Sequence, residues 1–211
     1  MEAQHMGRKL AVIILMSTLT TFSPATSHAQ NFTCAAADPA GDPNLSPGLG
    51  FDGAPYQDIL ETGIQRSGGA TVFSMEVAAP IPASPGLKTP NGRLLWMWGM
   101  STAPGAPQGF PLSPGVAGAL EFWIDVTWDG VSFTAEVIDR RPALEGGEPI
   151  ITSVPFTIDG ANVTVTANSA LFGDLHDFHW GSSTWFWPGH LGSTAPHVVD
   201  RAPDGLAPGC P

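Results

Sequence analysis

The chain has 211 residues, of which 43% are hydrophobic and only 13% charged, and its formal net charge is −11. Nucleic acids and anionic lipid surfaces are bound through Lys and Arg, so this excess of carboxylates disfavours both as partners. An acidic surface suits an exported protein that must stay soluble, and it can supply ligands to a hard cation such as calcium. The length and the apolar content fit a single folded domain.

Residues 1–29 have the pattern of a secretory signal peptide. The basic pair Arg8 and Lys9 precedes the apolar run Leu10–Met16, and residues 27–29 form a small-x-small cleavage motif. The apolar run is far shorter than the roughly 20 residues that a bilayer-spanning helix needs, which argues against a membrane anchor. We therefore expect a protein that is secreted, extracellular or periplasmic, and not inserted in a membrane.

The two cysteines, Cys34 and Cys210, lie near opposite ends of the exported chain. Export permits a disulfide, and two cysteines have only one intramolecular pairing. Closing a loop of this length would stabilise the fold by roughly 4–5 kcal/mol on the chain-entropy account. Two free thiols or intermolecular bridges are the alternatives.

The first half of the exported chain is loop-like and then turns to strand patterns. Residues 30–57 are rich in Pro, Gly and Asp, so we expect an N-terminal loop there. Asp58–Gln65 is expected to hold a short first strand near Ile59 and Ile64, and apolar and polar residues alternate in Ala70–Ala79. Gly92–Met100 is more continuously apolar, as expected of a central strand. The Pro/Gly-rich stretch Thr102–Gly118 exceeds the usual connection length, which indicates a functional loop or a poorly ordered one.

Leu120–Asp139 gives the clearest strand pair, because two alternating runs flank Asp129-Gly130. Asp-Gly in this setting predicts a two-residue turn with positive φ at both central positions. That turn would pair Trp128 with Val131 and would put every second residue of both strands on one apolar face.

The C-terminal third continues the strand pattern with short breaks. Further strands are predicted over residues 149–158, 162–167 and 178–187, and a last short strand within the tail 198–210. Pro155 suggests a sheet edge or a bulge, Asp159-Gly160 a second hairpin, and residues 168–172 one short helical turn. No stretch has a 3.6-residue apolar period. We therefore expect an all-β fold, a single antiparallel β-sandwich of jelly-roll or immunoglobulin-like type over residues 58–211, with little helix.

Several short motifs are shared with a known group of domains. They are DPAGD at 38–42, Asp58-Ile59, VFSMEVAAPIP at 72–82, VPFTIDGANVTVT at 154–166 and DRAPD at 200–204. Through these motifs, which run across most of the exported chain, the sequence resembles bacterial secreted β-sandwich domains related to the DOMON fold and to family 9 carbohydrate-binding modules. The resemblance implies a sandwich that binds sugar or haem or is purely structural, often attached to a larger secreted enzyme. We expect no attached catalytic domain in this chain.

Five aspartates form a candidate metal site. A disulfide between the two cysteines would limit the separation of the 38–42 and 200–204 turns, because each turn lies within a few residues of a cysteine. Calcium takes six to eight oxygens from carboxylates and loop carbonyls, so these residues predict one structural Ca2+ site. The alternative is that the aspartates only make turns by bonding their own backbone. The candidate ligands are Asp38, Asp42, Asp58, Asp200 and Asp204.

Seven tryptophans against a single tyrosine indicate an aromatic sugar-binding surface. In the predicted hairpin, Trp123 lies on the polar face, opposite Glu136 and near Asp125. Trp185 and Trp187 share a face if their segment is extended. We expect these five residues to bind a carbohydrate. The alternative is that the tryptophans fill the sandwich core or its ends.

The sequence offers weaker signals for a transition-metal site and for a catalytic site. Histidines at positions 176, 179, 190 and 197 have neither the HExxH spacing nor a neighbouring cysteine, so we expect solvated loop histidines rather than a transition-metal site. The absence of a GxSxG elbow, a Walker loop or a Cys/His nucleophile predicts that the protein is not an enzyme. The competing hypothesis is glycoside hydrolysis by the carboxylates of Asp125 and Glu136.

The sequence as a whole predicts an exported, monomeric, non-catalytic module that binds a carbohydrate at the cell surface or outside the cell. A polysaccharide or a protein would be a suitable partner, whereas nucleic acid would not. Two alternatives stay open: a structural or protein-interaction domain with no small ligand, and a hydrolase acting on glycans.

Overall fold

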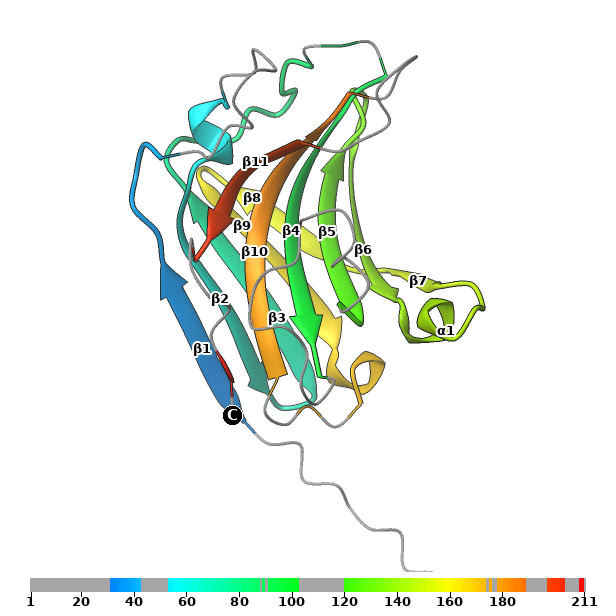
Figure 1. The fold of residues 1–211 in the computed structure, drawn as a ribbon. Coiled ribbons are helices and arrows are strands. Elements are labelled where there is room, and N and C mark those ends of the chain that lie inside the picture. Colours follow the sequence, from blue (N-terminus) through cyan, green and yellow to red (C-terminus); the bar gives the residue numbers. More distant parts are fainter. Residues whose placement is uncertain are drawn as a thin grey trace, which may run out of the picture.

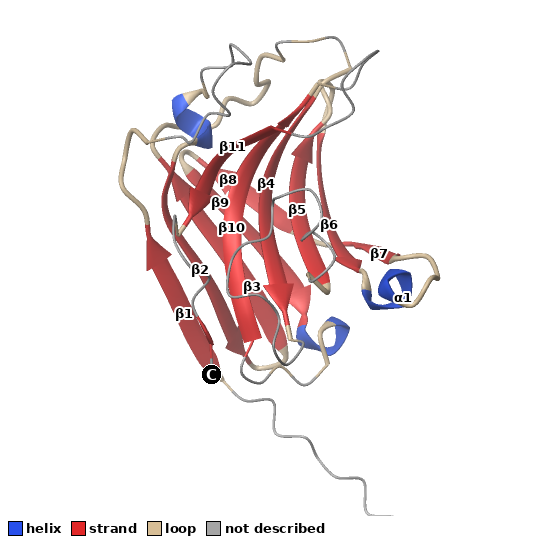
Figure 2. Cartoon of the chain, viewed as in Figure 1, coloured by secondary structure: helices blue, strands red, loops and turns tan. Residues whose placement is uncertain are grey.

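Two antiparallel sheets pack face to face (Figure 1). The computed structural model describes residues 31–42, 53–87, 89, 91–102, 120–173, 175, 178–188, 197–203 and 209–210. Strands dominate these residues, as Figure 2 shows, because alternating side chains along each strand bury one face of each sheet. The predicted all-β antiparallel sandwich is therefore confirmed.

The smaller sheet has the strand order β1-β2-β3-β9-β8, and the larger has β11-β10-β4-β5-β6-β7 with β12 beside β10. The smaller sheet comprises β1 (Phe32–Ala37), β2 (Ile59–Ser67), β3 (Ala70–Val77), β8 (Phe156–Asp159) and β9 (Asn162–Asn168). The larger comprises β4 (Arg93–Ser101), β5 (Phe122–Trp128), β6 (Phe133–Asp139), β7 (Ile150–Ser153), β10 (Phe178–Trp187), β11 (His197–Ala202) and β12 (Gly209–Cys210).

Helix is confined, within the described residues, to short turns. They are η1 (Pro55–Gln57), α1 (Arg141–Leu144) and η3 (Ser169–Leu171). The side chain of Asn168 caps η3 by accepting the N–H of Ala170 at 2.9 Å, which agrees with the helical turn predicted there. None of the described helices has the length and apolar character needed to cross a membrane.

The predicted N-terminal loop over residues 30–57 is wrong for its first part, because residues 32–37 form β1. This strand pairs with β2, and Cys34 lies opposite Ile64. After Phe32 its sequence, TCAAA, consists of small side chains that give little hydrophobic contrast between alternate positions. β1 is an edge strand, and ladder hydrogen bonds hold it to β2 on one side only. The sandwich therefore begins near Phe32 rather than at residue 58.

Tryptophans take a large share of the core between the sheets. Trp96, Trp98 and Trp128 are at most 4% exposed, as expected for a core role. The acceptors of their indole N–H groups, at 2.9, 3.0 and 3.0 Å, are Tyr56 O, Thr62 Oγ1 and Pro85 O respectively. Each of these three N–H groups has a partner, so these rings are buried without leaving a polar group unsatisfied. Trp180, 1% exposed, differs, because its Nε1 has no hydrogen-bond partner among the described residues.

The β5–β6 hairpin forms in a register that is shifted by two residues from the predicted one. Trp128 pairs with Phe133 rather than with Val131, and a four-residue connection results. Asp129 Oδ1 accepts the backbone N–H groups of the two residues after Gly130, at 2.8 and 2.9 Å. Only Gly130 in this connection has a positive φ, +96°, so the predicted two-residue turn does not form. Val131, expected in the core, is instead 85% exposed.

The predicted strand over residues 149–158 is in fact two strands in different sheets. β7 pairs with β6 in the larger sheet, and β8 pairs with β9 in the smaller one. Pro155 lies between them and has no N–H to offer a ladder, so the chain leaves one sheet and enters the other at this point. The Gly181-Ser182 pair, in contrast, does not interrupt β10.

A disulfide between Cys34 and Cys210 joins the two sheets at one edge, as predicted. Cys34 lies in β1 of the smaller sheet, and Cys210 lies in β12, which pairs with β10 of the larger sheet. The two Cα atoms are 6.0 Å apart. A structural disulfide fits an oxidising compartment, which agrees with the expected export. The predicted signal peptide, residues 1–29, lies outside the described residues.

Candidate functional site

The outer face of the larger sheet carries the predicted ligand-binding residues. Five neighbouring strands contribute one residue each to a row across this face: Ser183 (β10), Met97 (β4), Asp125 (β5), Glu136 (β6) and Ser153 (β7). The flanking residues in β4, β5 and β6 are buried between the sheets, or nearly so, and the row therefore points away from the smaller sheet. Two carboxylates thus lie side by side within one polar row.

Asp125 and Glu136 are directly opposed cross-strand neighbours. The predicted register, which put Trp123 opposite Glu136, is wrong, and the two-residue shift is what brings the carboxyl groups together. Opposed side chains in an antiparallel pair have Cβ atoms roughly 5 Å apart. Burial raises the pKa of Asp125 to about 7, and the negative charge of Glu136 adds to the rise. Near neutral pH Asp125 is therefore partly protonated.

Trp123 lies two residues before Asp125 on β5 and points to the same face. The guanidinium of Arg140 lies over its ring, 4.2 Å from the centroid, in a cation–π contact. Trp123 Nε1 and Asp125 Oδ1 are both buried, yet neither atom has a hydrogen-bond partner among the described residues. This face therefore carries a buried donor and a buried acceptor, two residues apart on β5, that no described residue satisfies.

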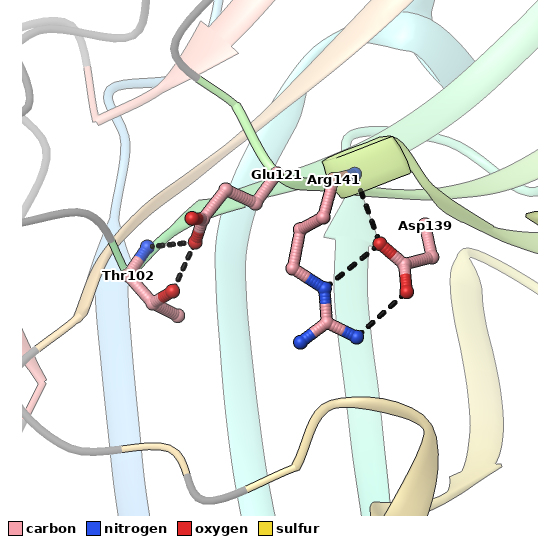
Figure 3. A network of polar contacts seen from close by, with 4 residues as sticks. All are labelled: Thr102, Glu121, Asp139 and Arg141. Carbon is pink, nitrogen blue, oxygen red and sulfur yellow. Dashed lines mark hydrogen bonds and ion pairs between the residues drawn. The ribbon is translucent and has the colours of Figure 1, made fainter. Parts of the chain in front are cut away.

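A polar network formed by Thr102, Glu121, Asp139 and Arg141 holds the neighbouring strand ends (Figure 3). Glu121, just before β5, accepts hydrogen bonds from the backbone N–H of Thr102 at 2.8 Å and from its hydroxyl. Asp139 at the end of β6 forms a bidentate pair with Arg141, at 2.9 and 2.6 Å, which lowers the pKa of Asp139. Because the Arg140 N–H also donates to the Glu121 carbonyl at 2.7 Å, the network fixes the backbone that carries Arg140.

Trp185 and Trp187 lie on the same outer face, as predicted for an extended segment. Trp185 is 9% exposed, and its Nε1 donates to Ser183 Oγ at 2.6 Å, so little of its ring is open to a ligand. Trp187 is 39% exposed at the end of β10, opposite Arg93 of β4. Since β4 separates β10 from β5, this pair lies apart from Trp123.

The predicted metal ligands converge at the other candidate site. Carboxylate oxygens of Asp38, Asp42 and Asp200 lie within 4.8 Å of one another. Asp38 follows β1 and Asp200 belongs to β11, so the group joins one edge of the smaller sheet to one edge of the larger. Asp204, also predicted as a ligand, lies outside the described residues.

Asp58 and Asp200 bond to segments that are distant in the sequence. Asp58 Oδ2 accepts the Gly41 N–H at 2.9 Å, and Asp200 Oδ2 accepts the Ile59 N–H at 2.5 Å. These contacts argue against the alternative that both residues only make local turns. Burial raises the pKa of Asp200 to about 6; its backbone hydrogen bonds oppose the rise, and the charges of Asp58 and Asp42 add to it.

The two described histidines, His179 in β10 and His197 in β11, lie beside opposite ends of β10. His179 pairs with Ser101 near one end of this strand, and His197 pairs with Phe186 near the other. His176 and His190 lie outside the described residues.

Sequence reasoning missed the contribution of Arg140 to the site. This residue directly follows β6, and in the observed register the last residue of β6, Asp139, lies opposite Phe122. Arg140 therefore comes level with the start of β5 and reaches Trp123, a neighbour that the predicted register does not produce. The order of strands across the sheet, which brings Met97 and Ser183 beside the carboxylates, is not encoded in local patterns.

No protein family, curated protein or solved structure matches this chain. The resemblance to DOMON-related domains and family 9 carbohydrate-binding modules therefore stays a prediction. A sandwich fold hosts many functions, so the function is inferred from the side chains of the two candidate sites.

Proposed function

We propose that the protein is an exported, non-catalytic module that binds a neutral carbohydrate on the outer face of its larger sheet. The observation that carries the proposal is the pair of buried, unpartnered atoms Trp123 Nε1 and Asp125 Oδ1 on β5. A sugar hydroxyl both donates and accepts hydrogen bonds, so neighbouring hydroxyls can satisfy the indole N–H and the carboxyl oxygen together. A ligand that does so relieves the free-energy cost of two buried polar groups.

Neighbouring side chains support a polar ligand in this position. Glu136 and Ser153 continue the row toward the sheet edge, and the buried Met97 lies beside Asp125. This mixture of apolar lining and a few placed polar groups is typical of small-molecule sites. Trp123 contributes its N–H rather than an open ring, because the Arg140 guanidinium already covers one face of the indole.

The charge of the site favours a neutral sugar over an anionic one. Asp125 and Glu136 adjoin, and the whole chain carries a formal net charge of −11. Sulfated or carboxylated glycans would meet like charges at this face, which costs binding free energy. The partly protonated Asp125 can also donate a hydrogen bond to a neutral ligand.

A glycan array, followed by calorimetric titration of the tightest neutral glycan, tests the proposal. We expect Trp123→Phe, which removes the N–H and keeps a ring, to weaken binding by about 5- to 10-fold, since a single hydrogen bond contributes about 1 kcal/mol. Asp125→Ala should weaken binding at least as much. Asp159→Ala, in the exposed β8–β9 turn of the other sheet, is the matched control and should bind as wild type does.

Two results would count against carbohydrate binding at this face. One is an array with no neutral-glycan signal from folded protein, and the other is unchanged affinity in both site variants. A glycan-negative protein that captures one specific protein partner would instead favour the alternative of an interaction domain.

Glycoside hydrolysis is the second candidate, because the pKa of Asp125 lies near 7 beside a second carboxyl group. Glycosidases use a pair of carboxyl groups of which one is protonated at the working pH, and the raised pKa of Asp125 suits that role. Sugar release from a bound neutral glycan, lost in Glu136→Gln, would support hydrolysis. A glycan that stays intact in the bound state would support the non-catalytic module.

A further inference from the structure

The acidic cluster brings together three chain segments that are far apart in the sequence. Asp38 and Asp42 flank the turn after β1, Asp58 precedes β2, and Asp200 lies in β11 of the other sheet. Oxygens of Asp38, Asp42 and Asp200 lie within 4.8 Å of one another. Ionised carboxylates at such distances repel one another strongly where water is excluded, so a bound cation would stabilise the arrangement.

Asp58 supplies an observation that is independent of this spacing. Its side chain is only 7% exposed, and its Oδ2 reaches the turn after β1 by accepting the Gly41 N–H at 2.9 Å. Its Oδ1 is buried without a hydrogen-bond partner in the described part of the chain, and so is Oδ1 of Asp42. The Gly41 bond places Asp58 beside the turn that carries Asp42, and Asp200 accepts the N–H of Ile59, the residue after Asp58. Asp58 and Asp42 therefore border Asp200. A cation in contact with the unpartnered oxygens would offset the cost of their burial.

We propose that Asp38, Asp42, Asp58 and Asp200 bind one calcium ion. The ligand set consists of oxygen, with no histidine or cysteine among the described members, which disfavours zinc and copper. Calcium accepts six to eight oxygens in irregular geometry, so loop carbonyls and water can complete its coordination. Magnesium demands a near-ideal octahedron and retains several waters, which suits a cage of four carboxylates less well.

The ion would join the two sheets near the end of β1, whereas the disulfide joins them near its start. The bond between Cys34 and Cys210 links β1 to β12, and Figure 1 shows the C-terminus beside the start of β1. At the other end, the fully buried Asp200 already accepts the N–H of Ile59 across the sheets. Calcium bound there would fasten the turn after β1 and the start of β2 to β11.

Calorimetric titration of the chelator-treated exported chain with calcium chloride tests the site, together with thermal melting in calcium and in EDTA. We expect one calcium per chain and a melting temperature about 5–10 °C higher at a calcium concentration 100 times the Kd. Asp42→Asn should weaken calcium binding at least about 10-fold; its side chain is partly exposed, so the fold should persist. Glu61→Gln removes the same charge from an exposed position of β2, outside the cluster, and should bind calcium as wild type does.

The absence of both binding heat and a melting shift on chelation would overturn the proposal. Equal calcium affinity in wild type and Asp42→Asn would also overturn it, as would magnesium binding as tight as calcium binding. Circular dichroism verifies that Asp42→Asn is folded, and Asp38→Asn provides the same comparison if it is not.

Discussion

Among single residues, Asp125 is the one whose chemistry is most altered by its surroundings. It faces Glu136 across the β5–β6 pair, and its Oδ1 is buried without a hydrogen-bond partner among the described residues. Burial and the neighbouring charge raise its pKa from 3.8 to about 7. A carboxyl group in such a setting is costly to ionise, and costs of this kind are concentrated at functional sites.

The raised pKa predicts a pH-dependent stability that is specific to Asp125. Between about pH 4 and pH 7 the folded state binds more protons at this group than the unfolded state, so its contribution to the free energy of unfolding falls as pH rises. Asp125→Asn removes this loss. The free energy of unfolding of Asp125→Asn, relative to that of wild type, should therefore rise by about 2 kcal/mol from pH 4.5 to pH 8. This is roughly half of what the full pKa shift would give without screening by solvent.

Urea unfolding of both proteins at the two pH values, in calcium-containing buffer, measures this difference. Asp159→Asn, with an exposed carboxyl group in the other sheet, is the control and should show no such trend. A wild-type to Asp125→Asn gap that stays constant with pH would contradict the assignment.

At the scale of elements, the two Asp-Gly hairpins behave differently although their sequences look alike. Asp159 pairs directly with Asn162, which leaves a two-residue turn after it. Asp129 instead accepts two backbone N–H groups with Oδ1 and widens its connection to four residues. A side-chain acceptor that satisfies loop N–H groups competes with the tighter turn.

Substituting Asp129 and Asp159 by alanine tests whether the two hairpins differ in this way. Asp129→Ala should lower the urea midpoint of unfolding, because two loop N–H groups lose their acceptor, whereas Asp159→Ala should leave it close to wild type. The slope of the unfolding transition should be the same for all three proteins. Equal effects of the two substitutions would show that the Asp129 bonds do not set the register.

Alternation along the chain predicts which residues are strands and which face each side chain takes. The assignment of Trp123, Asp125 and Glu136 to one outer face holds even though the hairpin register is wrong, because a shift of two residues preserves the face. The identity of the opposed pair does not survive such a shift. Strand β1 escapes prediction for another reason, since its alanines give no hydrophobic contrast.

The convergence of distant aspartates could be predicted because it follows from a covalent constraint. Cys34 and Cys210 have one intramolecular pairing, and that pairing limits how far the segments near them can separate. No such constraint predicts the other two contacts. The position of Arg140 over Trp123 depends on the hairpin register, and that of Met97 beside Asp125 depends on strand order.

On the scale of the whole molecule, the disulfide closes the sandwich at the edge where β1 and β12 meet. It spans a sequence separation of 176, so its loss frees a large part of the chain in the unfolded state. The double variant Cys34→Ser/Cys210→Ser should lose about 2–5 kcal/mol of unfolding free energy. Wild type should fall to a similar midpoint in urea when a reductant is present, while the double variant should not respond to it. A wild-type midpoint that ignores the reductant would contradict this structural role.

The indole N–H signal of Trp123 offers the most direct test of ligand binding at the outer face. A proton–nitrogen spectrum gives a separate indole signal for each of the seven tryptophans, and Trp123→Phe identifies the relevant one. On titration with the neutral glycan selected on the array, the Trp123 signal should shift and saturate with the calorimetric Kd. The signals of Trp96 and Trp98, whose N–H groups have acceptors in the core, should stay in place. A glycan that binds without moving the Trp123 signal would contradict carbohydrate recognition by this face.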